Sequence, residues 1–210
     1  MRKSSYLIIF VLLFLFVTSA YSQIGAGRDD STKIYTYKNV SSKPSGLFIT
    51  PFIGMDFPIK TFSQNSQNAL SYGARLEFAS LSIYPIILFG QYQFHNHPGK
   101  DAFKSQYYLN SMETRVSAVG GGVYILLNKY LKMNFTSPFI TGEINYFSIN
   151  RILSPDIEIP DLKKIDSRVA FTAGLGFTLY IFDIITSYNF AGEYSSLAVR
   201  TQFHFPLVKF

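Results

Sequence analysis

The sequence predicts an all-β protein, an eight-stranded antiparallel transmembrane β-barrel with an N-terminal signal peptide. Three observations support this prediction. Apolar and polar residues alternate with a period of two in segment after segment beyond residue 23, and one face of these segments carries no charge. Long connections between the segments alternate with tight turns. Hydrophobic residues make up 48% of the chain and charged residues only 15%, which is more apolar than most soluble domains.

Residues 1–22 are predicted to be a secretory signal peptide. Arg2 and Lys3 precede the apolar run "YLIIFVLLFLFV", and small residues follow in "TSAYS". The run is shorter than the roughly 20 apolar residues that a spanning helix needs, which disfavours an uncleaved anchor. Residues 23–45 are polar and are interpreted as a periplasmic N-terminal arm, with a ninth strand as the alternative. Residues 46–210 then form one barrel domain.

The composition excludes several other classes of protein. Signal removal takes two of the 19 Lys and Arg residues and none of the 13 acids, which leaves a mild positive excess. Because the cations are scattered, nucleic acid is not expected as a partner. The chain has no cysteine, so disulfide frameworks and thiolate metal sites are excluded.

The first four strands are expected near 47–57, 71–79, 84–95 and 112–127. The first, "LFITPFIGMDF", is rich in strand-forming residues but fits either register. In the next three, the face without charge is assigned to lipid, and it comprises Tyr72, Ala74, Leu76, Phe78, Ile86, Leu88, Gly90, Tyr92, Phe94, Val116, Ala118, Gly120, Gly122 and Tyr124. The opposite parity, assigned to the lumen, carries Arg75, Glu77, Gln91, Gln93, Glu113 and Arg115.

The last four strands are expected near 138–148, 167–181, 184–190 and 195–207. Their uncharged face comprises Ile140, Gly142, Ile144, Tyr146, Val169, Phe171, Ala173, Leu175, Phe177, Leu179, Ile184, Thr186, Tyr188, Phe190, Leu197, Val199, Thr201, Phe203 and Phe205. The lumenal parity includes Glu143, Arg168, Arg200 and His204. All strand charges are thus expected to point inward. A soluble lipocalin-type barrel would show the reverse pattern, with an apolar interior.

The connections fit the same architecture. Longer polar segments are expected at 58–70, 96–111 and 149–166, and tight turns near Ala79–Leu81 and Phe182–Asp183. Long loops at one end, short turns at the other and an even strand count are typical of outer-membrane barrels, whose termini are periplasmic.

The C-terminal segment "SLAVRTQFHFPLVKF" alternates and ends on an aromatic residue. With this segment and the barrel plan, the chain resembles the small outer-membrane barrel family of the outer-membrane protein A and X type. The resemblance implies a bacterial outer membrane, lipid contacts and recognition of Phe210 as an assembly signal by the barrel assembly machinery. Pro206 precedes a change of phase here, so that Val208 and Phe210 fall out of register with the lipid-facing set.

Inward charges are predicted to form a network in the lumen. Glu143, with Glu77 below it, is expected to be the anion around which the arginines pair. The predicted members are Arg75, Glu77, Arg115, Glu143, Arg168 and Arg200. Lumenal ion pairs are the ordinary way for a narrow barrel to satisfy inward charges.

The histidines give no strong sign of chemistry. His95 and His97, two residues apart, could offer two imidazoles to a metal, but no third ligand is near them in the sequence, and a solvated loop pair is favoured. His204 is expected to be a packed lumenal residue, far in height from any Ser or Glu that would complete a triad. Accordingly, no catalytic residue, metal or cofactor is expected.

Two further segments are given structural interpretations. Gly120–Gly122 lack the following helix and lysine of a phosphate loop, and are expected to permit a bulge or sharp curvature. The segment 149–166 mixes acids with lysines but matches no calcium loop, and it is interpreted as a solvated loop with an apolar core.

The expected function is a non-enzymatic envelope scaffold that binds an unidentified protein or surface ligand through its extracellular loops. Side chains fill an eight-stranded lumen, which argues against a general porin. The alternatives are a lipid-modifying hydrolase of the lipid A deacylase kind and a component of a secretion or assembly machine.

Overall fold

The computed structural model describes residues 45–209 apart from 129, 132–135 and 180–181. The predicted signal peptide, the arm up to residue 44 and the predicted assembly signal Phe210 lie outside the described residues. Among the described residues, none of the helices has the length and apolar character that a transmembrane helix requires.

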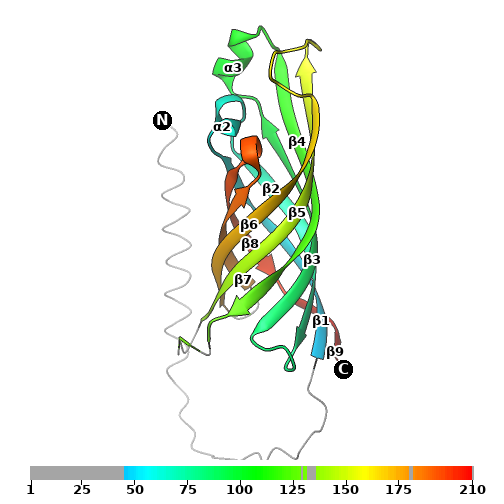
Figure 1. The fold of residues 1–210 in the computed structure, drawn as a ribbon, viewed down its shortest axis with the longest axis vertical. Coiled ribbons are helices and arrows are strands. Elements are labelled where there is room, and N and C mark those ends of the chain that lie inside the picture. Colours follow the sequence, from blue (N-terminus) through cyan, green and yellow to red (C-terminus); the bar gives the residue numbers. More distant parts are fainter. Residues whose placement is uncertain (1–44, 129, 132–135, 180–181, 210) are drawn as a thin grey trace, which may run out of the picture. The chain divides into compact units, whose positions relative to one another are not determined.

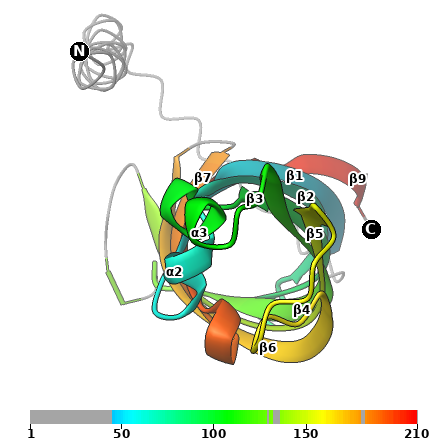
Figure 2. The ribbon, with the colours of Figure 1, turned by 90° about the horizontal axis from the view of Figure 1, so that it is seen from above.

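The described chain folds as a closed antiparallel sheet. Its strands are β1 (Ser45–Pro58), β2 (Ala69–Ser80), β3 (Ile86–Pro98), β4 (Ser111–Leu126), β5 (Ser137–Ser154), β6 (Ile165–Leu179), β7 (Phe182–Phe190), β8 (Ser196–Phe203) and β9 (Phe205–Lys209). Each strand pairs with the next along the chain as far as β8, and β1 pairs with both β2 and β8, which closes the barrel (Figure 2). The predicted fold class is confirmed.

The eighth position in the barrel wall is occupied by two consecutive strands, where the sequence predicted one over 195–207. β8 pairs with Phe52–Pro58 in the upper part of β1, and β9 pairs with the lower part, with a register shift between Leu47 and Phe48. The chain leaves the ladder at His204 between them. Pro206, which has no N–H to donate, follows this break. β8 and β9 therefore act as one interrupted strand along β1, and the barrel has eight strand positions.

The outer face of the barrel is apolar through its middle. Large apolar side chains with at least two fifths of their surface exposed include Ile53, Leu76, Leu88, Tyr92, Val119, Ile144, Phe171, Leu175 and Val199. The upper edge of this belt follows the pairing register, because Tyr92, Val119, Tyr146 and Val169 stand directly opposite one another across β3 to β6. At the next outward position toward the loop end, Ser117, Ser148 and Ser167 are paired. The belt thus ends in a row of aromatic and apolar residues and gives way to polar ones.

The predicted register of the fourth strand was wrong. Val116, Ala118 and Tyr124 are buried in the interior, whereas Val119 is 57% exposed and Arg115 is exposed on the outside. Two physical reasons explain the error. Gly120–Gly122 have no side chains, so alternation is lost in mid-strand, and the upper part of β4 lies above the apolar belt, where charged residues can face water. Charges therefore occur on both faces of the sheet, but the outward pair Glu113 and Arg115 lies beyond the belt.

Short helices cover the end of the barrel opposite the C-terminus (Figure 1). They are α2 (Phe62–Asn65), α3 (Asp101–Gln106) and the 3-10 turn η1 (Gly192–Tyr194). The connections after β1 and β3 are joined, because the Lys100 N–H donates to the Asn65 carbonyl at 3.0 Å and the Gln67 N–H donates to the Pro98 carbonyl at 2.7 Å. The expected long loops are thus partly folded.

The connection between β5 and β6 is shorter than expected because β5 continues to Ser154. Its apolar residues do form a core, as predicted, but that core is shared with the connection after β3. Leu109 and Met112 pack there with Leu153 and Ile159, and Phe103 of α3 lies against them.

No bulge occurs at Gly120–Gly122, contrary to one expectation. The register with β3 and β5 runs through all three residues without a shift. A Cβ on Gly120 would lie 2.1 Å from the carbonyl oxygen of Ile144, and one on Gly122 would lie 2.3 Å from that of Gly142. At these two positions glycine permits a close approach of the backbones of β4 and β5.

Candidate functional site

A buried ion network crosses the lumen at mid-height. Glu143 of β5 accepts at Oε1 a hydrogen bond from Arg75 Nη2 of β2 at 2.6 Å and one from Arg200 Nη2 of β8 at 2.8 Å. The exposed fractions of the three residues are 1% for Arg75 and 4% for Glu143 and Arg200. The inward parity of these three strands brings together residues up to 125 positions apart, so that one carboxylate bridges two guanidinium groups.

Side-chain amides satisfy the rest of the carboxylate. Gln91 Nε2 donates to Glu143 Oε2 at 2.8 Å, and Gln91 Oε1 of the same side chain accepts from Arg75 Nε at 2.7 Å. Asn145 Nδ2 also lies 3.3 Å from Glu143 Oε2. Arg75 further stacks over the Phe89 ring, with its guanidinium carbon 4.3 Å from the ring centroid. Because both oxygens of Glu143 accept hydrogen bonds, the desolvation cost of the buried charges is offset within the network.

The other three predicted members of the network lie elsewhere. Glu77 contacts His204 nearer the C-terminal end of the barrel. Arg115 lies on the outer face and pairs with the exposed Glu113 at 3.1 Å, a correction that follows from the register of β4. Arg168 does have inward parity but lies at the loop end, where it pairs with Asp166 and donates to the Ala191 carbonyl at 3.3 Å.

His204 lies between two carboxylates. Its Nδ1 is 2.9 Å from Glu77 Oε2, and its Nε2 is 2.8 Å from Asp183 Oδ2. The expectation that no Glu lies at its height was therefore wrong, because β2 places Glu77 and β7 places Asp183 at this level. With a carboxylate at each ring nitrogen, the arrangement suits an imidazolium that donates twice, and neither nitrogen is free to act as a general base.

A second buried cluster lies nearer the loop end, where Asp56 of β1 faces His95 and His97 of β3. His95 Nδ1 is 3.0 Å from His97 Nε2, and the two rings are 3.9 and 3.8 Å from the Asp56 carboxylate oxygens. All three side chains are at most 3% exposed, so the expectation of a solvated loop pair was wrong. Sequence reasoning missed Asp56 because the register of the first strand was ambiguous. Its inward parity, once known, is the signal that identifies it.

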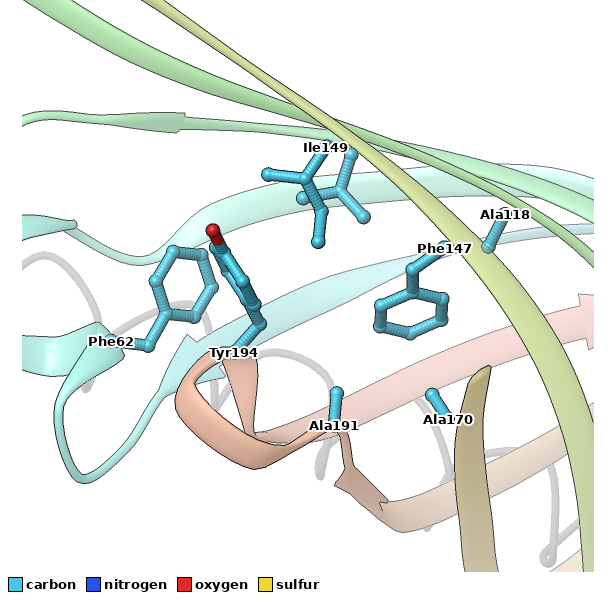
Figure 3. Packing of buried hydrophobic residues seen from close by; sticks show 8 residues of the cluster. Phe62, Ala118, Phe147, Ile149, Ala170, Ala191 and Tyr194 are labelled. Atoms are coloured by element: carbon cyan, nitrogen blue, oxygen red, sulfur yellow. The ribbon is translucent and has the colours of Figure 1, made fainter. Parts of the chain in front are cut away.

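An apolar cap covers this cluster. Phe62 of α2 and Tyr194 of η1 pack edge to face, 5.5 Å apart between ring centroids, in one apolar cluster with Phe147 and Ile149 of β5 (Figure 3). Phe62 also contacts the His97 ring at 4.7 Å. The cap therefore separates the polar interior of the barrel from the solvent at the loop end.

Charged residues lie on the outer side of this cap. The guanidinium carbons of Arg151 and Arg168 lie 4.9 and 4.6 Å from the Tyr194 ring centroid. Burial raises the pKa of the Tyr194 phenol. Burial acts to raise the pKa of Asp166 as well, but the hydrogen bond and charge of Arg168 outweigh it, so that this pKa lies below its ordinary value.

The fold and the lumen together define a class of protein. A closed sheet leaves no unpaired edge in the belt, the outside of the belt is apolar, and an ion network that is held by hydrogen bonds lies inside. This combination is that of a transmembrane β-barrel.

Comparisons with known proteins give no family. No protein-family model matches the sequence, and no curated protein matches it. Among solved structures, the chain is similar to that of the attachment invasion locus protein Ail of Yersinia pestis, which was solved in complex with the heparin analogue sucrose octasulfate. The two are 12% identical at a TM-score of 0.42, and the match covers 78% of this chain and 99% of that one.

Two further structures have a similar degree of likeness. The N-terminal β-barrel domain of Pseudomonas aeruginosa OprF is 11% identical at a TM-score of 0.43, and covers 78% of this chain and 100% of its own. Neisserial surface protein A is 8% identical at a TM-score of 0.42, with the same coverage. At these scores the likeness supports no conclusion on function, and the assignment of the fold rests on the strand pairing of this chain.

Proposed function

We propose that the protein is a non-enzymatic barrel of the bacterial outer membrane that anchors a folded extracellular platform and carries no solute through its lumen. The observation that supports this most directly is the buried Arg75–Glu143–Arg200 network across the middle of the barrel. A general pore needs water at this height, and here the space is filled by hydrogen-bonded side chains.

The apolar belt supports the membrane location. A lipid-facing Arg or Lys at mid-membrane costs about 2–4 kcal/mol, and the exposed side chains of the belt are uncharged. The outward pair of Glu113 and Arg115 does not conflict with this, because Arg115 is paired in the sheet with Asn96 and Asn150, above the row of Tyr92 and Tyr146. The short-turn end, where β1 begins and β9 ends, is then periplasmic, and α2, α3 and η1 are extracellular.

The extracellular end is suited to binding because it is folded. α3 rests on the apolar core that includes Leu109, Met112, Leu153 and Ile159, and Lys164 and Asp156 pair on the surface at 2.7 Å. Loops held on a rigid scaffold are common sites of recognition. The partner is proposed to be a protein or surface ligand that contacts this end.

The placement of the histidines favours a scaffold over a lipid-modifying hydrolase. The chain has three histidines, of which His95 and His97 are buried and His204 is held by two carboxylates. A hydrolase that acts on lipid headgroups would need its base at the outer surface of the belt, where an acyl chain can reach it. None of the three lies there.

Cell fractionation and gel mobility test the proposal. The mature chain should fractionate with outer membranes and should migrate faster on unboiled than on boiled gels, since a closed barrel resists denaturation by detergent. Recovery as a soluble monomer without detergent would contradict the membrane location. Release of fatty acid from lipid A by the purified protein would instead favour the hydrolase.

A further inference from the structure

We propose that Asp56, His95 and His97 form a binding site for a divalent transition-metal ion of the zinc type, inside the barrel beneath the cap made by Phe62. Each residue offers one ligand atom, and these atoms all lie within 4.8 Å of one another. This inference is independent of the proposed function, because it concerns the interior of the barrel and not its platform.

The spacing of the ligand atoms is close to that of a metal site. A tetrahedral ion with metal–ligand distances of about 2.0–2.1 Å places its ligand atoms roughly 3.3–3.4 Å apart. The two imidazole nitrogens are 3.0 Å apart, His97 Nε2 lies 3.8 Å from Asp56 Oδ1, and His95 Nδ1 lies 3.9 Å from the other carboxylate oxygen, Oδ2. One atom from each of the three residues lies within 4.8 Å of the other two, so modest rotations of the side chains would bring all three onto one ion.

Buried polar atoms at the cluster lack partners. Among the described residues, Asp56 Oδ1 and His95 Nε2 are buried without a hydrogen bond. The other carboxylate oxygen, Asp56 Oδ2, accepts from Ser196 Oγ at 3.1 Å and from Asn189 Nδ2 at 3.4 Å, which fixes the carboxylate and leaves Oδ1 directed at the histidines. An unpaired buried carboxylate oxygen is costly, and a bound cation removes that cost.

The surroundings of the histidines hold them as ligands. His97 Nδ1 lies 2.9 Å from the Gln67 carbonyl oxygen, which can only accept, so Nδ1 carries the proton and Nε2 presents its lone pair to the cluster. Metal-binding histidines usually donate their second N–H to such a group. Phe62 packs against His97 at 4.7 Å, and Phe147 packs against His95 at 6.1 Å, which restricts both rings.

The same geometry describes the metal-free cluster. With the proton of His97 on Nδ1, the 3.0 Å contact is a hydrogen bond from His95 Nδ1–H to His97 Nε2. A metal ion would take the place of that shared proton, and His95 would carry its proton on Nε2 instead. Both imidazoles remain neutral, so binding requires no ionisation of either ring.

The ligand set selects the class of ion. Two imidazoles and one carboxylate suit Zn²⁺ and its neighbours Co²⁺, Ni²⁺ and Cu²⁺, whereas Ca²⁺ and Mg²⁺ prefer oxygen ligands. Three protein ligands leave a fourth position for water.

Zinc binding to the mature protein, folded in detergent, tests the proposal. Because the cap covers the site, zinc chloride is present during refolding, and free metal is then removed on a desalting column. One zinc per chain should remain, and its release by chelator should be slow. Each of Asp56→Asn, His95→Gln and His97→Gln should weaken retention at least about 100-fold, since loss of an outer-shell partner alone costs 10–100-fold. The exposed control Glu113→Gln should retain zinc fully.

Two outcomes would overturn the site: no zinc retained by the folded wild type, or zinc retained equally by the three variants. Gel mobility without boiling establishes that each variant is folded. If a variant does not fold, X-ray absorption of the zinc-loaded wild type decides the matter. Two imidazole ligands in the first shell support the site, and a shell of oxygens alone contradicts it.

Discussion

Glu143 is the residue on which the barrel interior depends most. It neutralises two buried guanidinium groups, Arg75 and Arg200, that no other carboxylate bonds to directly among the described residues. Removing one partner of a buried pair leaves the remaining charge desolvated and unpaired, which costs far more than the net contribution of the intact pair.

We therefore expect Glu143→Gln to destabilise the barrel by about 3–5 kcal/mol, because the two arginines keep their charge and lose their anion. Urea unfolding in detergent, followed by tyrosine fluorescence or gel mobility, measures the shift of the midpoint. Glu113→Gln is a matched control, since it removes a carboxylate from an exposed pair with Arg115, and such surface pairs contribute about 0–1 kcal/mol. Equal midpoints for wild type and both variants would exclude the network. Lost activity or altered conductance at unchanged stability would instead indicate a catalytic or gating carboxylate.

Among the elements, β4 best shows where the sequence informs and where it does not. β5 was predictable because outward Ile144 and Tyr146 alternate regularly with the inward polar residues Thr141, Glu143 and Asn145. β4 was not predictable, because three glycines interrupt its alternation. In addition, the outer face of its upper half lies beyond the apolar belt and contacts water instead of lipid. The alternation rule assumes one environment on each face, and β4 passes through two.

The sequence also predicted Glu143 as the central anion but not the cluster around Asp56. An inward charge on a regular strand can be assigned from parity alone. The neighbours of Asp56 are set by the register of β2 with β1 and β3, which brings those two strands to the same height on either side of it, and by α2, which folds Phe62 over His97. Such contacts depend on the pairing of strands and on a loop that folds over them, and they leave no local pattern.

The glycines of β4 support a prediction about strand packing. Gly120→Ala should destabilise the barrel by about 1–3 kcal/mol, because its Cβ would lie 2.1 Å from a backbone oxygen of β5. Gly142→Ala is the matched control on the neighbouring strand, since a Cβ there meets nothing within 4 Å. Thermal unfolding in detergent compares the two, and equal loss in both would contradict a role in close backbone approach.

In the whole molecule, the interior is layered along the barrel axis. His204 with its two carboxylates occupies the C-terminal end, the Glu143 network lies above it, the Asp56 cluster follows, and the apolar cap of Phe62 and Tyr194 closes the loop end. The Glu143 network joins β5 to β2 and β8, so it also ties distant strands together. The barrel is sealed by the same contacts that stabilise it.

Single-channel recording in planar bilayers tests this sealed lumen most directly. The purified wild-type barrel, inserted at a single copy and under a steady potential, should show no stable conductance, because the Glu143 network, the Asp56 cluster and the apolar cap obstruct the lumen one above another. Insertion is verified independently by protease protection of reconstituted vesicles. Large, stable, ion-conducting steps from the wild-type protein would contradict the account and identify a channel.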